Sequence, residues 1–337
     1  MVSAPRAAIF NPTIEISSAT TIDLNSMKNE IKKMEKVELH MHFYGSIPRR
    51  VIQQHATPQQ YNEICRKLDQ IKEGIDYHDA FDVFKLIENV VNTPALVEEA
   101  AYELCLDLIQ DNVVHAELRT GFKKLGSENF ESYLEAILRG IERGTKNSSL
   151  TVGFVPSLRR ETLAKDAIET LLLAEKHRER GICGIDVSGD IMKGDGVGMM
   201  EGIKLAHQFA FPITLHLGES SKEAQGKQLM EITSIQPRRI GHGAYLSDPV
   251  FGWVKKNQIP VELCFTSATK VILENGKVHP ALQLLKENHP VVICTDNLLV
   301  FDTNLTDECF QVALKNNISI DQLKNLQEQA KQYSFFQ

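Results

Sequence analysis

Four histidines and two carboxylates stand at or just after the ends of short apolar runs, where they could bind a metal ion together. They are His40, His42, His216, Glu219, His242 and Asp296. His40 and His42 are two residues apart, so in a β-strand both imidazoles would point to the same side. Asp296 follows a very apolar run. A buried, unpaired carboxylate there would be costly, so Asp296 needs a cation or hydrogen-bond donors.

Each of these residues also has an ordinary structural explanation when it is considered alone. Two histidines two apart occur by chance, and a histidine at a strand end can be a core residue with satisfied hydrogen bonds. The metal-site hypothesis depends on the joint placement of all six at predicted strand ends. In a barrel of parallel strands these ends meet on one face, where such folds carry their active sites.

The donor set indicates zinc chemistry. Imidazoles and a carboxylate, without a thiolate, suit a Zn²⁺ ion that keeps one position open for water. Bound zinc lowers the pKa of that water from about 15.7 to about 7, which gives a hydroxide nucleophile at neutral pH. Glu219 can then carry a proton to a substrate ring nitrogen and later to the leaving amine, while His242 and Asp296 orient the hydroxide. The residues therefore predict hydrolytic attack on an electrophilic carbon.

Eight short runs of strand-forming residues would position these groups. The runs are Lys36–His42, Val113–Arg119, Thr151–Leu158, Ile182–Ser188, Ile213–Leu217, Arg239–Gly243, Val261–Phe265 and Val291–Thr295. Between them, segments such as Leu134–Arg143, Leu163–Arg178 and Met199–Phe209 repeat apolar residues at helical spacing. Eight strands alternating with helices favour a (β/α)8 TIM barrel, although a doubly wound open sheet would give a similar pattern.

The connection after the first run is unusually long, because residues 43–112 separate it from the second. Its segments Arg50–Gln54, Tyr61–Gln70 and Phe81–Val91 have helical patterns. We therefore expect extra helices inserted after the first strand, over the mouth of the barrel. Residues 1–23 are rich in Ser, Thr, Ala and Pro and are expected to form a flexible N-terminal extension. Residues 24–337 are expected to form one domain.

Composition narrows the class of protein. The chain has 337 residues, of which 42% are hydrophobic and 24% charged. A chain of this length and composition can bury a sizeable hydrophobic core. A net charge of −7 argues against nucleic acid or an anionic membrane as a partner. The six cysteines show no C-x-x-C spacing, and neither a signal peptide nor a transmembrane run is recognisable. We expect a cytoplasmic monomer that acts on a small molecule.

Seven short motifs are spread along the chain. They are Val37-Glu38-Leu39-His40-Met41-His42 with Gly45-Ser46-Ile47, Ala116-Glu117-Leu118-Arg119, Gly184-Ile185-Asp186-Val187-Ser188-Gly189-Asp190, His216-x-x-Glu219, Arg239-Ile240-Gly241-His242-Gly243, Glu262-Leu263-Cys264-x-Thr266-Ser267 and Ile293-Cys294-Thr295-Asp296. With these motifs the chain resembles the adenosine deaminase family from about Lys36 to beyond Phe301. Within the family it is most similar to the branch that acts on N6-methyl-AMP. The cysteine spacings exclude the other zinc deaminases, which use H-x-E and P-C-x-x-C motifs.

The resemblance implies a role for each motif residue. It implies one zinc ion per chain, with ligands His40, His42, His216 and Asp296. It implies that Glu219 is the proton shuttle, His242 the partner of the hydroxide and Gly189 a backbone contact to the purine. His42 also belongs to the expected substrate site.

Departures from the branch are confined to the substrate side. Tyr44 replaces a ribose-contacting Asn, Glu88 a substrate-contacting histidine and Leu158 an aspartate. The segment Thr120-Gly121-Phe122-Lys123 replaces one similar to Ser-Thr-Pro-Arg that helps to hold the nucleotide, and Lys123 lacks the forked geometry of arginine. Asn297 replaces the second of two aspartates, and its amide can still donate to purine N7. Neutral drift would explain one such change, but not five changes on the same side of the expected substrate site.

Three functions are compatible with this pattern. The favoured hypothesis is zinc-dependent hydrolytic deamination of an adenine-type purine at C6, with N6-methyl-AMP or a related adenine nucleotide or nucleoside as substrate. A second hypothesis keeps the zinc chemistry but directs it to another heterocyclic amine. The third is a catalytically silent purine-binding protein.

Overall fold

Eight parallel strands form the centre of the protein, as the sequence pattern predicts. The computed structural model describes residues 23–74, 77–190, 193–223, 225–273 and 277–336. The strands are β1 Lys36–His42, β2 Val113–Thr120, β3 Thr151–Arg159, β4 Ile185–Ser188, β5 Ile213–Leu217, β6 Arg239–His242, β7 Val261–Cys264 and β8 Val291–Cys294. Each is hydrogen-bonded to the next in chain order. The predicted N-terminal extension, apart from Asp23, lies outside the described residues.

The sheet closes on itself between its first and last strands. Met41 of β1 forms a parallel bridge to Asp296, directly after β8. Two backbone hydrogen bonds make this bridge, from His42 N to Asp296 O at 2.8 Å and from Asp296 N to His40 O at 2.9 Å. The fold is a (β/α)8 TIM barrel, and the open-sheet alternative is excluded. The closing bridge also brings Asp296 next to the two histidines of β1.

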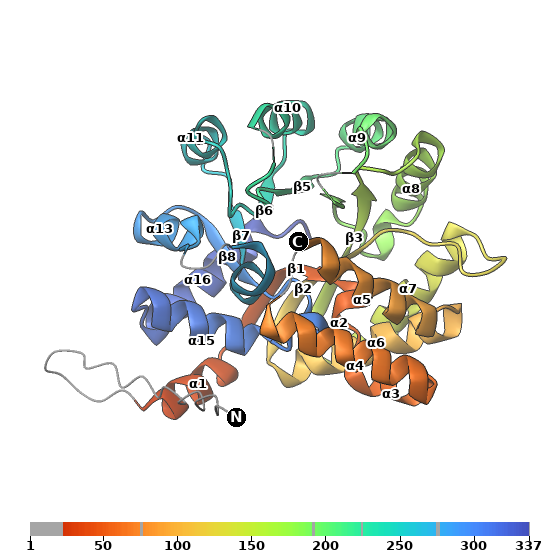
Figure 1. Ribbon diagram of the computed structural model, residues 1–337, viewed down its shortest axis with the longest axis horizontal. Coiled ribbons are helices and arrows are strands. Elements are labelled where there is room, and N and C mark those ends of the chain that lie inside the picture. Colours follow the sequence, from red (N-terminus) through yellow and green to blue (C-terminus); the bar gives the residue numbers. More distant parts are fainter. Residues whose placement is uncertain (1–22, 75–76, 191–192, 224, 274–276, 337) are drawn as a thin grey trace, which may run out of the picture.

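Helices surround the barrel in the order that the connections require (Figure 1). After β2 they are α7 Phe130–Thr145, α8 Ala164–Lys176, η1 Arg178–Arg180, α9 Val197–Gln208, α10 Gln225–Ile235, α11 Asp248–Lys256, α12 Phe265–Ser267, the π-helix η2 Ala268–Ile272, α13 Pro280–Lys286, α14 Leu298–Phe301, α15 Leu305–Asn316 and α16 Ile320–Tyr333. α1 Leu24–Lys33 precedes the barrel and packs against α15 and α16. Among the described residues no helix is both long and apolar enough to cross a membrane.

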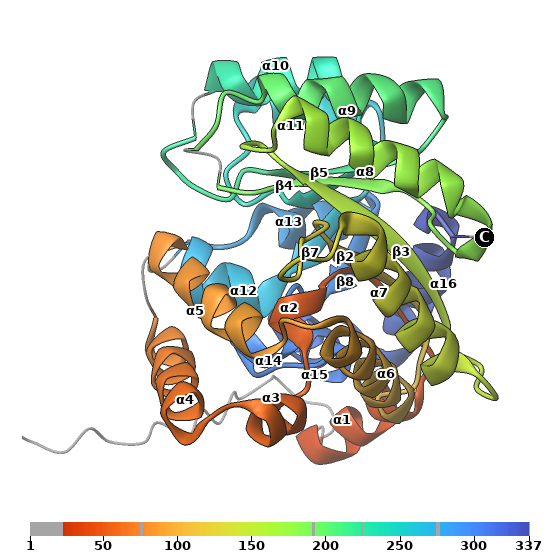
Figure 2. The same cartoon turned by 90° about the vertical axis from the view of Figure 1, so that its right-hand side faces the viewer.

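The long first connection is helical, as predicted. It contains α2 Phe43–Ser46, α3 Arg49–His55, α4 Pro58–Glu73, α5 Tyr77–Val90 and α6 Pro94–Gln110. Thr57 and Gln60 form a capping box at the start of α4, with Pro58 in its first turn. Figure 2 shows α3, α4 and α5 together on one side of the molecule, with the chain's C-terminus on the opposite side. The insertion therefore adds walls to the barrel at the end where α2 follows β1.

The fourth strand is shorter than the sequence pattern indicates. Ile182 forms only an isolated bridge to Phe154, and regular pairing of β4 begins at Ile185. Gly184 lies between the two and packs against the ring of Phe335, where a Cβ would be 2.3 Å from a ring carbon. A glycine in a strand accommodates such a close approach and interrupts the ladder.

Helices α6 and α7 approach each other closely at Gly140. A Cβ on Gly140 would lie 2.5 Å from the carbonyl oxygen of Glu98 and 2.6 Å from Cβ of Ala101. Gly140→Ala is expected to lower the free energy of unfolding by roughly 1–3 kcal/mol, because the two helices must move apart. Gly252→Ala in α11 is the matched control, since a Cβ there would meet nothing within 4 Å. Urea unfolding should show the control unchanged or stabilised, and equal midpoints for both variants would contradict the packing argument.

Candidate active site

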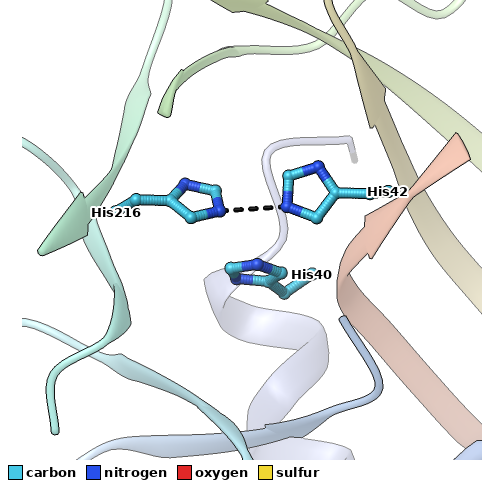
Figure 3. A group of neighbouring side chains, drawn as sticks. All are labelled: His40, His42 and His216. Atoms are coloured by element: carbon cyan, nitrogen blue, oxygen red, sulfur yellow. Dashed lines mark hydrogen bonds between the residues drawn. The ribbon is translucent and has the colours of Figure 1, made fainter. Parts of the chain in front are cut away.

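The ends of β1, β5, β6 and β8 bring four histidines and one aspartate to a single centre. The possible ligand atoms of His40, His42 and His216 lie within 4.8 Å of one another, and so do those of His40, His242 and Asp296. His42 Nε2 is 3.0 Å from His216 Nε2, and Figure 3 shows these two rings facing each other with the His40 ring below them. Oδ1 of Asp296 is 3.6 Å from His42 Nε2 and 3.8 Å from His40 Nε2. These nitrogen and oxygen atoms could bind one metal ion.

Two of these imidazoles are oriented by carboxylates behind them. His40 Nδ1 is 2.6 Å from Glu262, and His216 Nδ1 is 2.9 Å from Asp186. Each ring therefore turns its Nε2 toward the centre. Nε2 of His40 is buried and has no hydrogen-bond partner among the described residues. A carboxylate on one ring nitrogen and an open second nitrogen are typical of metal-binding histidines.

The charge states fit a cation as well. Burial holds the pKa of His40 well below its usual value and lowers the pKa of His42 to about 3, so both rings are neutral and able to bind a metal. Burial raises the pKa of Asp296 to about 7, so its carboxylate is poorly stabilised without a nearby cation. A metal ion at this centre would supply that charge.

The backbone at two of these strand ends adopts an uncommon conformation. His242 has φ 63° and Asp296 has φ 65°, in the left-handed region that residues other than glycine seldom occupy. Such conformations cost free energy and persist where the surrounding structure holds them, which is often at functional sites. Here both occur directly in the cluster of possible metal ligands.

A buried ionic network supports the cluster from below. Glu262 contacts Arg119 and Arg239 as well as His40, and Arg119 also contacts Asp186. Burial alone would raise the pKa of Glu262, but the two guanidinium groups lower it to about 2. The pKa of Asp186 is likewise depressed, because His216 and Arg119 outweigh the effect of burial. Both carboxylates therefore stay charged behind the histidines.

The sequence motifs contained these network residues but assigned them no role. Glu262 lies between Val261 and Leu263, and Asp186 between Ile185 and Val187, in runs that are otherwise apolar. An acid in an apolar run, the signal that points to Asp296, therefore also marks these two, whose side chains belong to β4 and β7 and not to the residues after a strand end.

Glu219 and His242 lie next to each other at the centre. Oε1 of Glu219 is 3.5 Å from Nε2 of His242, and both side chains are almost fully buried. Glu219 follows the end of β5, three residues after His216. The arrangement places a carboxyl group that can carry protons beside the possible metal ligands.

These groups open into a cavity of about 380 Å³ between the strand ends and the inserted helices. Nine of the ten sequence-predicted substrate residues line it, namely His42, Tyr44, Glu88, Thr120, Gly121, Phe122, Lys123, Gly189 and Asn297. His216, Glu219, His242 and Asp296 line it too. A second cavity, of about 520 Å³, lies beside α1 and α15 and contains none of the clustered histidines.

Leu158 is the one predicted substrate residue that the structure does not bring to the cavity. Its neighbours in β3, Ser157 and Arg159, line the cavity, so strand alternation directs Leu158 to the opposite face. Leu158 is fully buried there, and its Cδ1 lies 2.7 Å from where a Cβ on Gly202 of α9 would be. The interpretation of Leu158 as a substrate contact is therefore corrected: it packs between the barrel and its helices.

Other residues that line the cavity have polar contacts of their own. Nζ of Lys123 is 2.6 Å from Oε1 of Glu88 and 4.8 Å from the centre of the Tyr44 ring. The Tyr44 hydroxyl donates to the carbonyl of Val91 at 3.3 Å. The side-chain nitrogen of Asn297 donates to Asp296, which leaves Oδ1 of Asn297 buried without a hydrogen-bond partner among the described residues.

Known proteins similar to this chain share its fold and length. The family model described as adenosine deaminase matches residues 35–337. An adenosine deaminase-like protein of Drosophila pseudoobscura pseudoobscura is 29% identical, with 90% of this chain and 92% of the relative covered. The adenosine deaminase of Clostridium botulinum strain Okra is also 29% identical, over 90% and 94% of the two chains. The crystal structure of Arabidopsis N6-mAMP deaminase superposes with a TM-score of 0.82 at 26% identity, over 92% and 96% of the two chains. Similar Arabidopsis structures are complexes with IMP and GMP.

Proposed function

Because this chain belongs to the adenosine deaminase family and is a hydrolytic purine deaminase, we propose that it uses one zinc ion to deaminate an adenine-type purine at C6. The proposal depends mainly on His40. Its Nε2 is buried, has no hydrogen-bond partner among the described residues and lies near His42, His216 and Asp296, while Glu262 contacts its Nδ1. These four residues would hold the zinc ion. When bound, zinc supplies a nucleophilic oxygen at neutral pH by lowering the pKa of a water molecule.

The other residues of the centre move the protons. Protonated Glu219 gives its proton to a ring nitrogen of the purine, which makes C6 more electrophilic. Its carboxylate then takes a proton from the attacking water and passes it to the leaving amine. His242, 3.5 Å from Glu219, orients the attacking oxygen. The surrounding burial excludes bulk water, so charges on these groups act strongly on the substrate.

The purine would be held by groups on either side of the metal ligands. Gly189 lines the cavity with φ 90°, a conformation that favours glycine, so its backbone can face the purine there. Asn297 keeps one buried amide oxygen available for a donor on the substrate. Relatives named for N6-methyl-AMP, together with the IMP and GMP complexes, support an adenine nucleotide or nucleoside as the substrate class.

Amine release from a panel of adenine compounds tests the proposal. Zinc-loaded protein is incubated with adenosine, AMP, N6-methyladenosine, N6-methyl-AMP and adenine, and ammonia or methylamine and the 6-oxo purine are measured. We expect turnover of at least one compound, and loss of that turnover after a chelator removes the metal. Absence of product from every member of the panel, with zinc bound, would contradict the proposed function.

A further inference from the structure

We propose that the substrate carries an uncharged hydroxyl rather than a phosphate at its 5′ end, because Glu88 already pairs with the lysine that would hold a phosphate. The inference rests on the proposed function for the position of the purine. The Glu88–Lys123 pair would then favour the nucleoside over the nucleotide as substrate.

The pair lies on the wall of the substrate cavity, at its more open end. Glu88 comes from α5 of the helical insertion, and Lys123 from the loop after β2. Their charged atoms are 2.6 Å apart, and the two side chains are 33% and 27% exposed. Glu219 and His242, by contrast, are 7% and 2% exposed. With the purine at the buried centre, its sugar extends toward the exposed end where the pair lies.

Every other lysine or arginine that lines the cavity in the described part of the chain is also paired with a carboxylate. The remaining pairs are Arg119 with Asp186 at 3.3 Å, Lys85 with Asp82 at 3.9 Å, Arg159 with Glu161 at 2.5 Å and Lys193 with Asp190 at 3.3 Å. A bound phosphate usually contacts cations that are free to face it. Here a phosphate would have to share its cation with a carboxylate that already contacts it.

Charge and hydrogen bonding at the pair both favour a hydroxyl. A phosphate monoester carries about −1.5 to −2 charges at pH 7, so it would be repelled by Glu88. An ionised carboxylate can only accept hydrogen bonds, and an ammonium group can only donate them. A sugar hydroxyl can donate to Glu88 and accept from Lys123 at once, without breaking the pair. Glu88 would thus separate this chain from the Arabidopsis relatives solved with IMP and GMP.

Comparison of kcat/KM for nucleosides and their 5′-monophosphates tests the inference. For the zinc-loaded full chain we expect adenosine or N6-methyladenosine to exceed its monophosphate by about 100-fold, as expected for a like-charge contact. Glu88→Gln keeps the shape but removes the charge, and should narrow this preference about tenfold by raising nucleotide turnover. Adding Lys123→Met should abolish the gain, because the freed lysine is its cause. Glu201→Gln, on the outer face of α9 beside Lys204, is the matched control and should leave the ratio unchanged.

Product binding makes the result independent of turnover. Calorimetric dissociation constants for inosine and IMP, measured on the zinc-loaded chain, should show inosine bound more tightly, and Glu88→Gln should reduce the difference. The inference would be overturned if IMP bound more tightly than inosine or if neither product bound detectably. It would also be overturned if the gain in nucleotide turnover of Glu88→Gln persisted after Lys123→Met was added. A protein that deaminates no adenine compound but prefers inosine over IMP would contradict only the proposed function.

Discussion

Glu219→Gln is expected to lower kcat by about 10²–10⁴-fold while zinc stays bound, because an amide of nearly the same shape cannot carry protons. The carboxyl group of Glu219 lies beside His242 and lines the substrate cavity. It is not one of the proposed metal ligands. The loss should therefore appear in kcat with the substrate that the wild-type protein turns over best, whereas the zinc content by atomic absorption should be unchanged.

Glu223→Gln is a matched control from the same loop. Glu223 is also buried, but it does not line the cavity, and its carboxylate accepts from Gly218 N at 2.7 Å and from Gln228 at 3.1 Å. The substituted amide keeps an oxygen that can accept from Gly218, so turnover should stay near the wild-type rate. If Glu219→Gln retained full activity, proton transfer would have to be assigned to another group. A purine-binding protein without turnover would instead show unchanged ligand affinity in Glu219→Gln and no product in the wild type.

The strands of the barrel could be predicted because apolar, strand-forming runs are interrupted by polar and helical segments. Seven of the eight observed strands begin at the predicted residue, and only β4 begins later than expected. The reason is Gly184, whose contact with Phe335 joins positions 151 residues apart in the chain. No local pattern encodes that contact. The closing bridge between Met41 and Asp296 was likewise implied only by the number of strands.

The centre of the site could be predicted for the same reason, because strand ends converge in a barrel. His40, His42, His216, His242 and Asp296 could be selected from residue type and position alone, and the structure brings them together.

The contacts around this centre, behind the histidines and along the cavity wall, could not be predicted in the same way. An acid in an apolar run marks Glu262 and Asp186 in the sequence, but the pairing of each with a histidine, and with Arg119 between them, depends on how the strands pack. The Glu88–Lys123 pair joins a helix of the insertion to a barrel loop, so spacing along the chain gives no sign of it. Such contacts depend on how distant elements pack, which sequence periodicity does not specify.

Glu262→Gln should weaken both the metal site and the fold. Glu262 is fully buried, lies 2.6 Å from both His40 Nδ1 and Arg239 Nε, and accepts from Thr214 at 2.8 Å. Loss of its charge leaves Arg119 and Arg239 less well compensated in the core, which is expected to destabilise the fold by about 3–5 kcal/mol. His40 also loses its anionic partner, so zinc affinity is expected to fall by about 10–100-fold. Zinc titration with a competing chelator and urea unfolding would measure the two effects.

Glu117→Gln separates the loss of stability from the loss of zinc affinity, because Glu117 also pairs with Arg239 but is not a neighbour of the proposed metal ligands. Its carboxylate contacts Arg239, and its Oε1 accepts from Ser334 Oγ at 3.0 Å and from the backbone N of Phe335 at 2.5 Å. It therefore ties the C-terminal segment to the base of the barrel without contacting His40. Glu117→Gln should lower the stability of the fold, as Glu262→Gln does, but leave zinc affinity close to that of the wild type. Equal losses of zinc affinity in both variants would mean that the metal site responds to the stability of the network as a whole, and not to the carboxylate that orients His40.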